Sequence, residues 1–172
     1  MTGLEPAGPA TTGVLFVCLG NICRSPLAEA IFHDLAARRS ALHLLDIDSC
    51  GTGGWHVGKG ADPRSVQIAA VNGLRLDHTA RQLDPATDFE RFDLLVPMDR
   101  DNQQALLHHG AAASKVRLAR TFDAAAAGEP EWRLDVPDPY YGGDDGFRQV
   151  FEMLTRACDG LLNHVLNQRP PR

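Results

Sequence analysis

The sequence predicts a single three-layer α/β domain built around a parallel sheet, and three observations support this prediction. Short apolar runs of strand length alternate along the chain with longer segments whose apolar residues recur every three or four positions. This alternation is typical of parallel strands joined by right-handed crossover helices. The 172 residues also suffice for one core, and neither an internal repeat nor a domain-splitting linker divides them.

The first strand and the first helix are the clearest elements. Residues 14–17, Val-Leu-Phe-Val, form a continuous apolar run, which indicates a strand buried on both faces. Gly20 then breaks the run. Ser25 and Pro26 predict the start of a helix, with Ser25 as its N-cap and Pro26 at the first helical position, and apolar spacing continues the helix to about Arg39.

The remaining elements continue the same alternation. Strands are predicted at residues 44–50, 92–96 and 115–118, and helices at 62–74, 99–109 and from 146 to about 165. With the first strand they make a four-stranded parallel sheet flanked by helices. The segment 121–145 is rich in Pro, Gly and Asp and has little periodicity. Because long irregular loops in compact domains are often functional, we expect a functional role there.

The ends of the chain and its charge bound the function further. We expect the domain at residues 13–166, between a disordered lead-in at 1–12 and a short tail at 167–172. The lead-in does not resemble a signal peptide, and no apolar run approaches the roughly 18 residues that a membrane helix needs. The formal net charge of -5 carries no nucleic-acid signature. These features predict a cytoplasmic protein without membrane or nucleic-acid partners, while export without a signal peptide stays open.

The four cysteines, Cys18, Cys23, Cys50 and Cys158, are too few for a disulfide scaffold. Cys18 and Cys23 are close in sequence, but no second pair of Cys or His residues stands at zinc-finger spacing. We therefore expect neither a metal site nor another cofactor. Cys50 and Cys158 are expected to be core residues.

The stretch from Cys18 to Ser25, Cys-Leu-Gly-Asn-Ile-Cys-Arg-Ser, leaves the first strand and enters the first helix. Ligands bind at the carboxyl ends of strands in open α/β sheets, and a helix N-terminus attracts anions. Gly20 permits the tight turn that wraps backbone N–H groups around a phosphate. A Walker-type loop is excluded because no G-x4-G-K-[ST] pattern occurs. The stretch predicts another kind of phosphate-binding loop, in which Cys18 and Arg24 are accompanied by Leu19, Gly20, Asn21, Ile22, Cys23 and Ser25.

Cys18 would lie at the floor of this anion site, where the field that attracts phosphate also favours the thiolate, the attacking form of cysteine. The planar guanidinium of Arg24 can hold two phosphate oxygens and stabilise the charge that develops during transfer. The Ser25 hydroxyl can cap the helix, point at the Cys18 sulfur, or do both by exchange. A buried cysteine in a strand is usually only packing, but here the glycine, the arginine and the helix start favour a nucleophile.

A cysteine-dependent phosphatase also needs an acid that protonates the leaving oxygen. Asp138 lies in the irregular segment between Pro137 and Pro139, which stiffen the backbone on either side. Tyr140 and Tyr141 follow and could wall a pocket that suits an aromatic ring. An ordinary Asp-Pro turn with surface tyrosines is the alternative. Asp138 is our candidate for the general acid.

Residues 14–30, Val-Leu-Phe-Val-Cys-Leu-Gly-Asn-Ile-Cys-Arg-Ser-Pro-Leu-Ala-Glu-Ala, together with Asp-Pro-Tyr-Tyr-Gly at 138–142, resemble the low-molecular-weight protein tyrosine phosphatase family. The resemblance covers roughly residues 13–165. It implies hydrolysis of phosphotyrosine in protein substrates and of small aryl phosphates, with phosphate or other oxyanions bound in the active site and no metal. Cys18 would attack phosphorus while Asp138 protonates the leaving oxygen, and water activated by Asp138 would then hydrolyse the cysteinyl-phosphate.

The resemblance also implies supporting roles. Four polar residues would hold the loop in shape: Asn21, Ser25, Ser49 and His78. Three aromatic residues would wall the substrate pocket, whose slot Leu19 and Ile22 also line: Trp55, Tyr140 and Tyr141. Cys23 could form a reversible disulfide with Cys18 that protects the nucleophile. Residues 123–132 match nothing in the family, and no role is assigned to them.

Three other functions are weighed against this one. An arsenate reductase on this fold would need resolving cysteines after the third strand, and residues 80–110 contain none. Related protein-arginine phosphatases carry a Thr where this chain has Ile22, and the larger apolar side chain favours an aryl phosphate. A phosphate-binding module without turnover would not need Cys18, Arg24 and Asp138 together.

Overall fold

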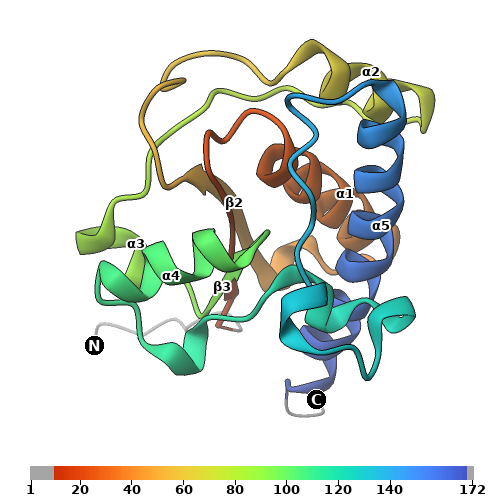
Figure 1. The fold of residues 1–172 in the computed structure, drawn as a ribbon. Coiled ribbons are helices and arrows are strands. Elements are labelled where there is room, and N and C mark those ends of the chain that lie inside the picture. Colours follow the sequence, from red (N-terminus) through yellow and green to blue (C-terminus); the bar gives the residue numbers. More distant parts are fainter. Residues whose placement is uncertain (1–9, 170–172) are drawn as a thin grey trace, which may run out of the picture.

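The structure, a computed structural model, describes residues 10–169 and centres on a parallel sheet with helices on both faces (Figure 1). The strands are β1 (Thr12–Cys18), β2 (Leu45–Gly51) and β3 (Leu94–Pro97), in the order β2-β1-β3. The α-helices are α1 (Arg24–Arg38), α2 (Pro63–Val71), α3 (Pro85–Arg91), α4 (Arg100–His108) and α5 (Asp144–Asn167). The predicted α/β class is confirmed.

The central strand β1 is buried on both faces, as its unbroken apolar sequence predicts. It pairs in parallel with β2, Val14 opposite Ile47, and with β3, Val14 opposite Leu94. Successive side chains of a strand point to opposite faces, so β1 contributes to two separate cores. Val14 and Phe16 belong to one apolar cluster, and Leu15 and Val17 belong to the other.

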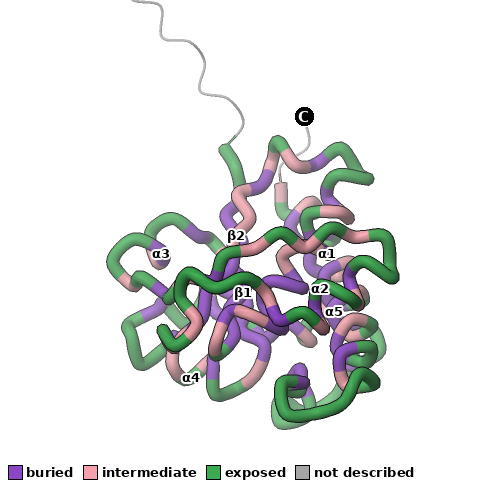
Figure 2. The backbone as a smooth tube through the Cα atoms, turned by 90° about the horizontal axis from the view of Figure 1, so that it is seen from above, coloured by how far each residue is buried: buried purple, intermediate pink, exposed green. Residues whose placement is uncertain are grey.

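The two clusters define the layers of the domain. The larger cluster joins β1 to α1 and α5 through Leu27, Ile31, Phe32, Leu154, Leu161 and Leu162. The smaller cluster covers the opposite face of the sheet with Phe92, Leu95, Leu106 and Val116, around α3 and α4. Figure 2 shows the buried residues gathered in the strands and on the inner sides of the helices, with exposed residues on the outside. The strands therefore have an apolar core on each side, which supports the loops at their carboxyl ends.

The predicted fourth strand at residues 115–118 is not a full strand, and within residues 10–169 the sheet has three strands rather than four. A single bridge joins Val116 to Leu95, and the Arg117 N–H donates to the Leu95 carbonyl at 3.0 Å. A 3-10 turn ends at Lys115 and another begins at Ala119, so too few residues stay extended between them to continue the ladder.

Helix α1 begins earlier than predicted, which corrects the assignment of Ser25. Cys23 is the N-cap and Arg24 the first helical residue, so Ser25 lies inside the first turn and Pro26 occupies the third position. Pro26 lacks an N–H, and the first-turn N–H groups of a helix have no partner within the helix anyway. The Ser25 hydroxyl does not cap the helix and instead lies 3.0 Å from the Cys18 sulfur.

Helices α2 and α4 begin where the sequence predicts, after Asp62 and Asp99, and each of these carboxylates accepts a backbone N–H of the first turn. Helix α3 is an element that the sequence analysis missed. Its start has the same chemistry, with Asp84 as N-cap and Pro85 as the first residue. The seven residues of α3 are too few for a helical period to stand out.

The start of the irregular segment at 121–145 is held by two ion pairs to one buried carboxylate. It contains short 3-10 turns, among them η4 (Ala124–Ala126) and η5 (Glu131–Arg133). The Asp123 carboxylate, fully buried, pairs with Arg120 and with Arg156 of α5. This contact anchors the start of the segment to the last helix.

The two ends of the described chain lie next to each other. Strand β1 already includes Thr12, the last residue of the predicted lead-in, and α5 ends at Asn167. Arg169 donates to the carbonyl oxygens of Ala10 and Leu44, which ties the end of the described chain to its beginning. Residues 1–9 and 170–172, which hold most of the predicted lead-in and tail, lie outside the described residues. Within residues 10–169, no helix has the length and apolar character to span a membrane.

Candidate active site

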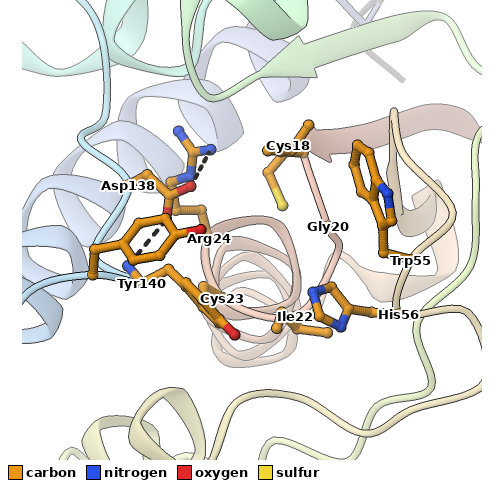
Figure 3. Close-up of a pocket in the computed structure, with 11 residues that line it drawn as sticks. Cys18, Gly20, Ile22, Cys23, Arg24, Trp55, His56, Asp138 and Tyr140 are labelled. Atoms are coloured by element: carbon orange, nitrogen blue, oxygen red, sulfur yellow. Dashed lines mark hydrogen bonds and ion pairs between the residues drawn. The ribbon is translucent and has the colours of Figure 1, made fainter.

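Residues 18–25, called the Cys18 loop below, leave β1 at its carboxyl end and pass directly into α1 (Figure 3). The carbonyl oxygens of Cys18 and Leu19 accept hydrogen bonds of 2.9 Å from the N–H groups of Thr52 and Gly53. A Cβ at Gly51 would lie 2.8 Å from the Leu19 carbonyl oxygen, so the end of β2 can approach the loop this closely only as glycine. The loop is thus fixed against the neighbouring strand.

Cys18 is almost fully buried and its sulfur has two hydrogen-bonding neighbours. The Ser25 hydroxyl oxygen lies 3.0 Å from Sγ, and the Asn21 N–H donates to Sγ at 3.3 Å. These contacts fix the position of the sulfur at the floor of the loop. Of the alternatives for Ser25, the structure favours the contact with Cys18.

The tight turn of the loop falls at Asn21 rather than at Gly20. Asn21 has φ 54°, in the left-handed region, which asparagine tolerates better than most residues. Its side chain fixes the turn, because Nδ2 donates to Ser25 Oγ at 2.8 Å and to Ser49 Oγ at 3.0 Å. Gly20 has another reason to be glycine, since a Cβ there would lie 2.9 Å from the ring of His56.

The four residues expected to form a network around the loop do lie together. His78 Nε2 is 2.8 Å from the Asn21 carbonyl oxygen, and Ser49 Oγ donates to Glu29 Oε2 at 2.6 Å. Burial lowers the pKa of His78 and raises that of Glu29, so both shifts favour neutral side chains. The sequence analysis assigned no role to Glu29. Its position four residues after Ser25, on the same face of a helix, is the signal that could have indicated it.

Arg24 is buried and strongly oriented. Its Nη1 donates to Asp99 Oδ2 at 2.5 Å and to the Val136 carbonyl at 3.0 Å. Burial works against the Arg24 cation, but Cys18, Asp99 and Asp138 outweigh burial and raise its pKa. The role of Asp99 in holding Arg24 was not predicted. Its place just after β3, at the carboxyl edge that also holds the Cys18 loop, is the available signal.

Asp138 joins these residues from the irregular segment. Its carboxylate lies 3.4 Å from Arg24 Nη2 and accepts the Tyr140 N–H at 3.1 Å. Cys18, Arg24 and Asp138 line one pocket of about 310 Å³. The structure therefore brings together the three residues for which the sequence predicts chemistry.

Aromatic side chains form the walls of this pocket. Figure 3 shows Tyr140 beside Asp138 on one side and Trp55 on the other, with the Cys18 sulfur between them. Trp55 is 69% exposed, Tyr140 is 39% exposed and Tyr141 is 94% exposed, so rings are available at the entrance. The other residues that line the pocket are Leu19, Gly20, Ile22 and Cys23, which were predicted, and His56, which was not.

The remaining cysteines differ from Cys18. Cys23 lines the same pocket but is 5% exposed, and burial, with help from Asp62, raises its pKa to about 12. Cys50 and Cys158 lie in the apolar clusters, where burial raises their pKa, and their prediction as core residues is confirmed. All four cysteines are free in the structure.

Comparisons with known proteins agree on one family. A family model described as low molecular weight phosphotyrosine protein phosphatase matches residues 13–170. A low molecular weight protein-tyrosine-phosphatase of Streptomyces coelicolor is 49% identical over 161 residues, which cover 92% of this chain and 96% of the relative. The crystal structure of YfkJ from Bacillus subtilis is similar with a TM-score of 0.85 and 34% identity, covering 95% of this chain and 99% of that one. A protein tyrosine phosphatase from Entamoeba histolytica, solved with Hepes in the active site, has a TM-score of 0.83 and 34% identity, covering 91% and 98%.

Proposed function

Since the chain belongs to the low molecular weight phosphotyrosine protein phosphatase family, we propose that it uses Cys18 as nucleophile, Arg24 as phosphate clamp and Asp138 as acid and base. The chain is a protein tyrosine phosphatase and hence a hydrolase. One observation supports the three roles most directly: Asp138, far away in sequence, lines the same pocket at the carboxyl end of β1 as Cys18 and Arg24.

In the first step the Cys18 thiolate attacks the phosphorus of phosphotyrosine. A sulfur–phosphorus bond forms and the bond from phosphorus to the tyrosine oxygen breaks. The Asp138 carboxyl group gives its proton to that oxygen, so the leaving group departs as neutral tyrosine. The contacts of Sγ with the Ser25 hydroxyl and the Asn21 N–H hold the sulfur in position for attack.

In the second step the cysteinyl-phosphate is hydrolysed. The Asp138 carboxylate takes a proton from water, the water oxygen bonds to phosphorus, and the sulfur–phosphorus bond breaks. Inorganic phosphate leaves, Cys18 returns as a thiolate and Asp138 is protonated again. One carboxyl group thus serves as acid and then as base.

Arg24 acts in both steps through charge and geometry. Asp99 and the Val136 carbonyl fix Nη1, while Nη2 has the weaker 3.4 Å contact with Asp138 and is available to phosphate. A guanidinium held in this way binds the equatorial oxygens of the transferring group, where charge accumulates in the transition state. The backbone N–H groups at the start of α1 add to this stabilisation.

The pocket walls suggest the substrate class. Trp55 and Tyr140 face each other across the entrance and can hold an aromatic ring between them, which fits phosphotyrosine in proteins and small aryl phosphates. Phosphate and other oxyanions would bind in the Cys18 loop in the same way as the substrate's phosphoryl group. We propose that residues 13–166 form the catalytic domain and that the protein acts in the cytoplasm.

A comparison of two phosphopeptides tests this function. Phosphate release from a phosphotyrosine peptide and a phosphoarginine peptide is measured in reductant for the wild type, Cys18→Ser and Asp138→Asn. We expect tyrosine turnover that Cys18→Ser abolishes and that Asp138→Asn lowers by about 10²-fold or more, as general acids typically contribute. Activity that survives in Cys18→Ser would refute the nucleophile. Faster turnover of phosphoarginine would keep the mechanism and refute the argument that Ile22 favours an aryl phosphate.

A further inference from the structure

The turn that carries Asp138, residues 138–142, lies at the surface and is called the acid turn below. Its own hydrogen bonds are local: the Tyr140 N–H donates to Asp138 Oδ1 at 3.1 Å, and the Gly142 N–H donates to the Pro139 carbonyl at 3.0 Å. Tyr141 is almost fully exposed. A general acid must be held within a fraction of an ångström of its working position, and the 3.4 Å contact between Asp138 and Arg24 needs support from further contacts outside the turn.

Arg64, the second residue of α2, reaches the acid turn from another part of the fold. Its Nη2 donates to the Tyr140 carbonyl at 3.0 Å and its Nη1 donates to the Gly142 carbonyl at 3.3 Å. The guanidinium also lies over two rings, 4.5 Å from the centre of Phe147 on α5 and 5.7 Å from that of Tyr140. These contacts attach both ends of the tyrosine pair to α2.

The other edge of the Arg64 guanidinium binds the carboxylate of Asp62, a residue that is hydrogen-bonded to the Cys18 loop. Nε donates to Asp62 Oδ1 at 3.0 Å and Nη2 to Asp62 Oδ2 at 2.9 Å. The Asp62 side chain is only 8% exposed, and its backbone N–H donates to the Ile22 carbonyl at 2.8 Å. The next residue of α2, Ser65, donates its hydroxyl to the Cys23 carbonyl at 3.3 Å.

We propose that Arg64 is a positioning residue that sets the distance between Asp138 and the Cys18 loop. Asp62 ties the guanidinium to the loop that holds the nucleophile, and the two donated hydrogen bonds tie it to the turn that holds the acid. Arg64 does not need to touch the substrate for this role. The proposal rests on the acid role proposed for Asp138, and its test must separate the two.

Arginine suits this position for geometric reasons. The planar guanidinium presents donors in fixed directions and can serve a bidentate carboxylate and two carbonyl oxygens at once. A lysine ammonium is a point charge on a flexible stem and cannot reproduce that fork. Arg64→Lys therefore keeps the charge and removes most of the geometry, whereas Arg64→Gln removes both.

The leaving group of the substrate reports whether the acid is in place. Phenyl phosphate needs a proton on its departing oxygen, while 2,4-dinitrophenyl phosphate has a leaving group stable enough to depart without one. We expect Arg64→Gln to lower kcat/KM for phenyl phosphate by about tenfold or more, as a small misplacement of a catalytic group can, and to change kcat/KM for 2,4-dinitrophenyl phosphate by less than about threefold. Arg64→Lys should fall between Arg64→Gln and the wild type on phenyl phosphate.

Two further variants complete the experiment. Arg75→Gln removes another arginine that pairs with an aspartate, Asp77. Both members of this pair are exposed and away from the acid turn, so kcat/KM for both substrates should stay at the wild-type value. In the Asp138→Asn background, Arg64→Gln should lower kcat/KM for phenyl phosphate by less than about threefold, because residues that act through one group are not additive.

Each outcome bears on one of the two proposals. Equal losses on both aryl phosphates would overturn the positioning role, since Arg64 would then support the Cys18 loop or the fold as a whole. The positioning role would also be overturned if Arg64→Gln lowered kcat/KM for phenyl phosphate as much in the Asp138→Asn background as in the wild type. If Asp138→Asn lowered kcat/KM equally for both aryl phosphates, the acid role of Asp138 would be refuted, whatever the effect of Arg64→Gln.

Discussion

Asn21 combines a left-handed backbone with a fully bonded side chain, and this combination shapes the Cys18 loop. A left-handed conformation costs an ordinary residue about 1–2 kcal/mol. Asn21 compensates because Nδ2 donates to Ser25 and Ser49, while Oδ1 accepts the Arg81 N–H at 2.9 Å. These partners come from α1, β2 and the irregular stretch before α3, so the shape of the loop depends on the assembled domain as much as on its own sequence.

Cys23 supports a prediction about oxidation. Its pKa of about 12 keeps it a thiol at neutral pH, so peroxide should first convert Cys18 to a sulfenic acid. Cys23 must give up its proton as its sulfur attacks the Cys18 sulfur, and that proton leaves with the sulfenic hydroxyl as water while the disulfide forms. We expect wild-type activity to return fully in dithiothreitol after peroxide treatment, while Cys23→Ser recovers much less because Cys18 proceeds to the sulfinic acid.

The matched control is Cys158→Ser, which changes a cysteine buried in the core at a distance from the pocket. This variant should recover as fully as the wild type. Equal recovery of Cys23→Ser and the wild type would contradict a protective role for Cys23.

Among the helices and strands, those whose positions depend on local side-chain chemistry were predicted from the sequence. The apolar run of β1 and the Asp starts of α2 and α4 follow from side-chain burial and N-capping. The prediction of a fourth strand was wrong because the flanking 3-10 turns leave only a single bridge at Val116. The strand propensity of Val116 does not reveal those turns. Helix α3 was missed because it is short.

Contact between elements also explains a glycine in the middle of the last helix. A Cβ at Gly160 of α5 would lie 1.9 Å from the Phe122 carbonyl oxygen in η3 (Ala119–Phe122). Replacement of a glycine by alanine inside a helix ordinarily stabilises it by up to about 1 kcal/mol. Here we expect Gly160→Ala to lower the free energy of unfolding by about 1–3 kcal/mol, because the backbone of η3 must move.

Urea denaturation of Gly160→Ala measures this effect, and Gly146→Ala in the same helix is its control. A Cβ at Gly146 would find its nearest neighbour, Pro139 Cβ, at an ordinary 3.6 Å. The free energy of unfolding of Gly146→Ala should equal or exceed that of the wild type. A Gly160→Ala variant as stable as Gly146→Ala would show that α5 and η3 are not in tight contact.

At the scale of the whole molecule, the parallel sheet assembles the site. The carboxyl ends of β1 and β3 lie at one edge, so the Cys18 loop meets Asp99, and the irregular segment passes the same edge with Asp138. The loop motif predicted Cys18 and Arg24 as members of the site, and the family resemblance together with the need for an acid pointed to Asp138. The sequence could not predict that Asp99 holds Arg24 or that Arg64 ties the acid turn to α2, because each is an ordinary ion-pair former until the fold places its partner.

The central claim is that phosphate passes through a covalent bond to Cys18, and trapping that bond tests it most directly. Asp138→Asn is mixed with 2,4-dinitrophenyl phosphate, which can phosphorylate the enzyme without an acid, and quenched rapidly in alkaline denaturant for peptide mass spectrometry. Because the second step then lacks its base, we expect a phosphoryl group to accumulate on the peptide containing Cys18. Release of dinitrophenol with no phosphoryl group on Cys18, or with one on another residue, would refute the covalent mechanism.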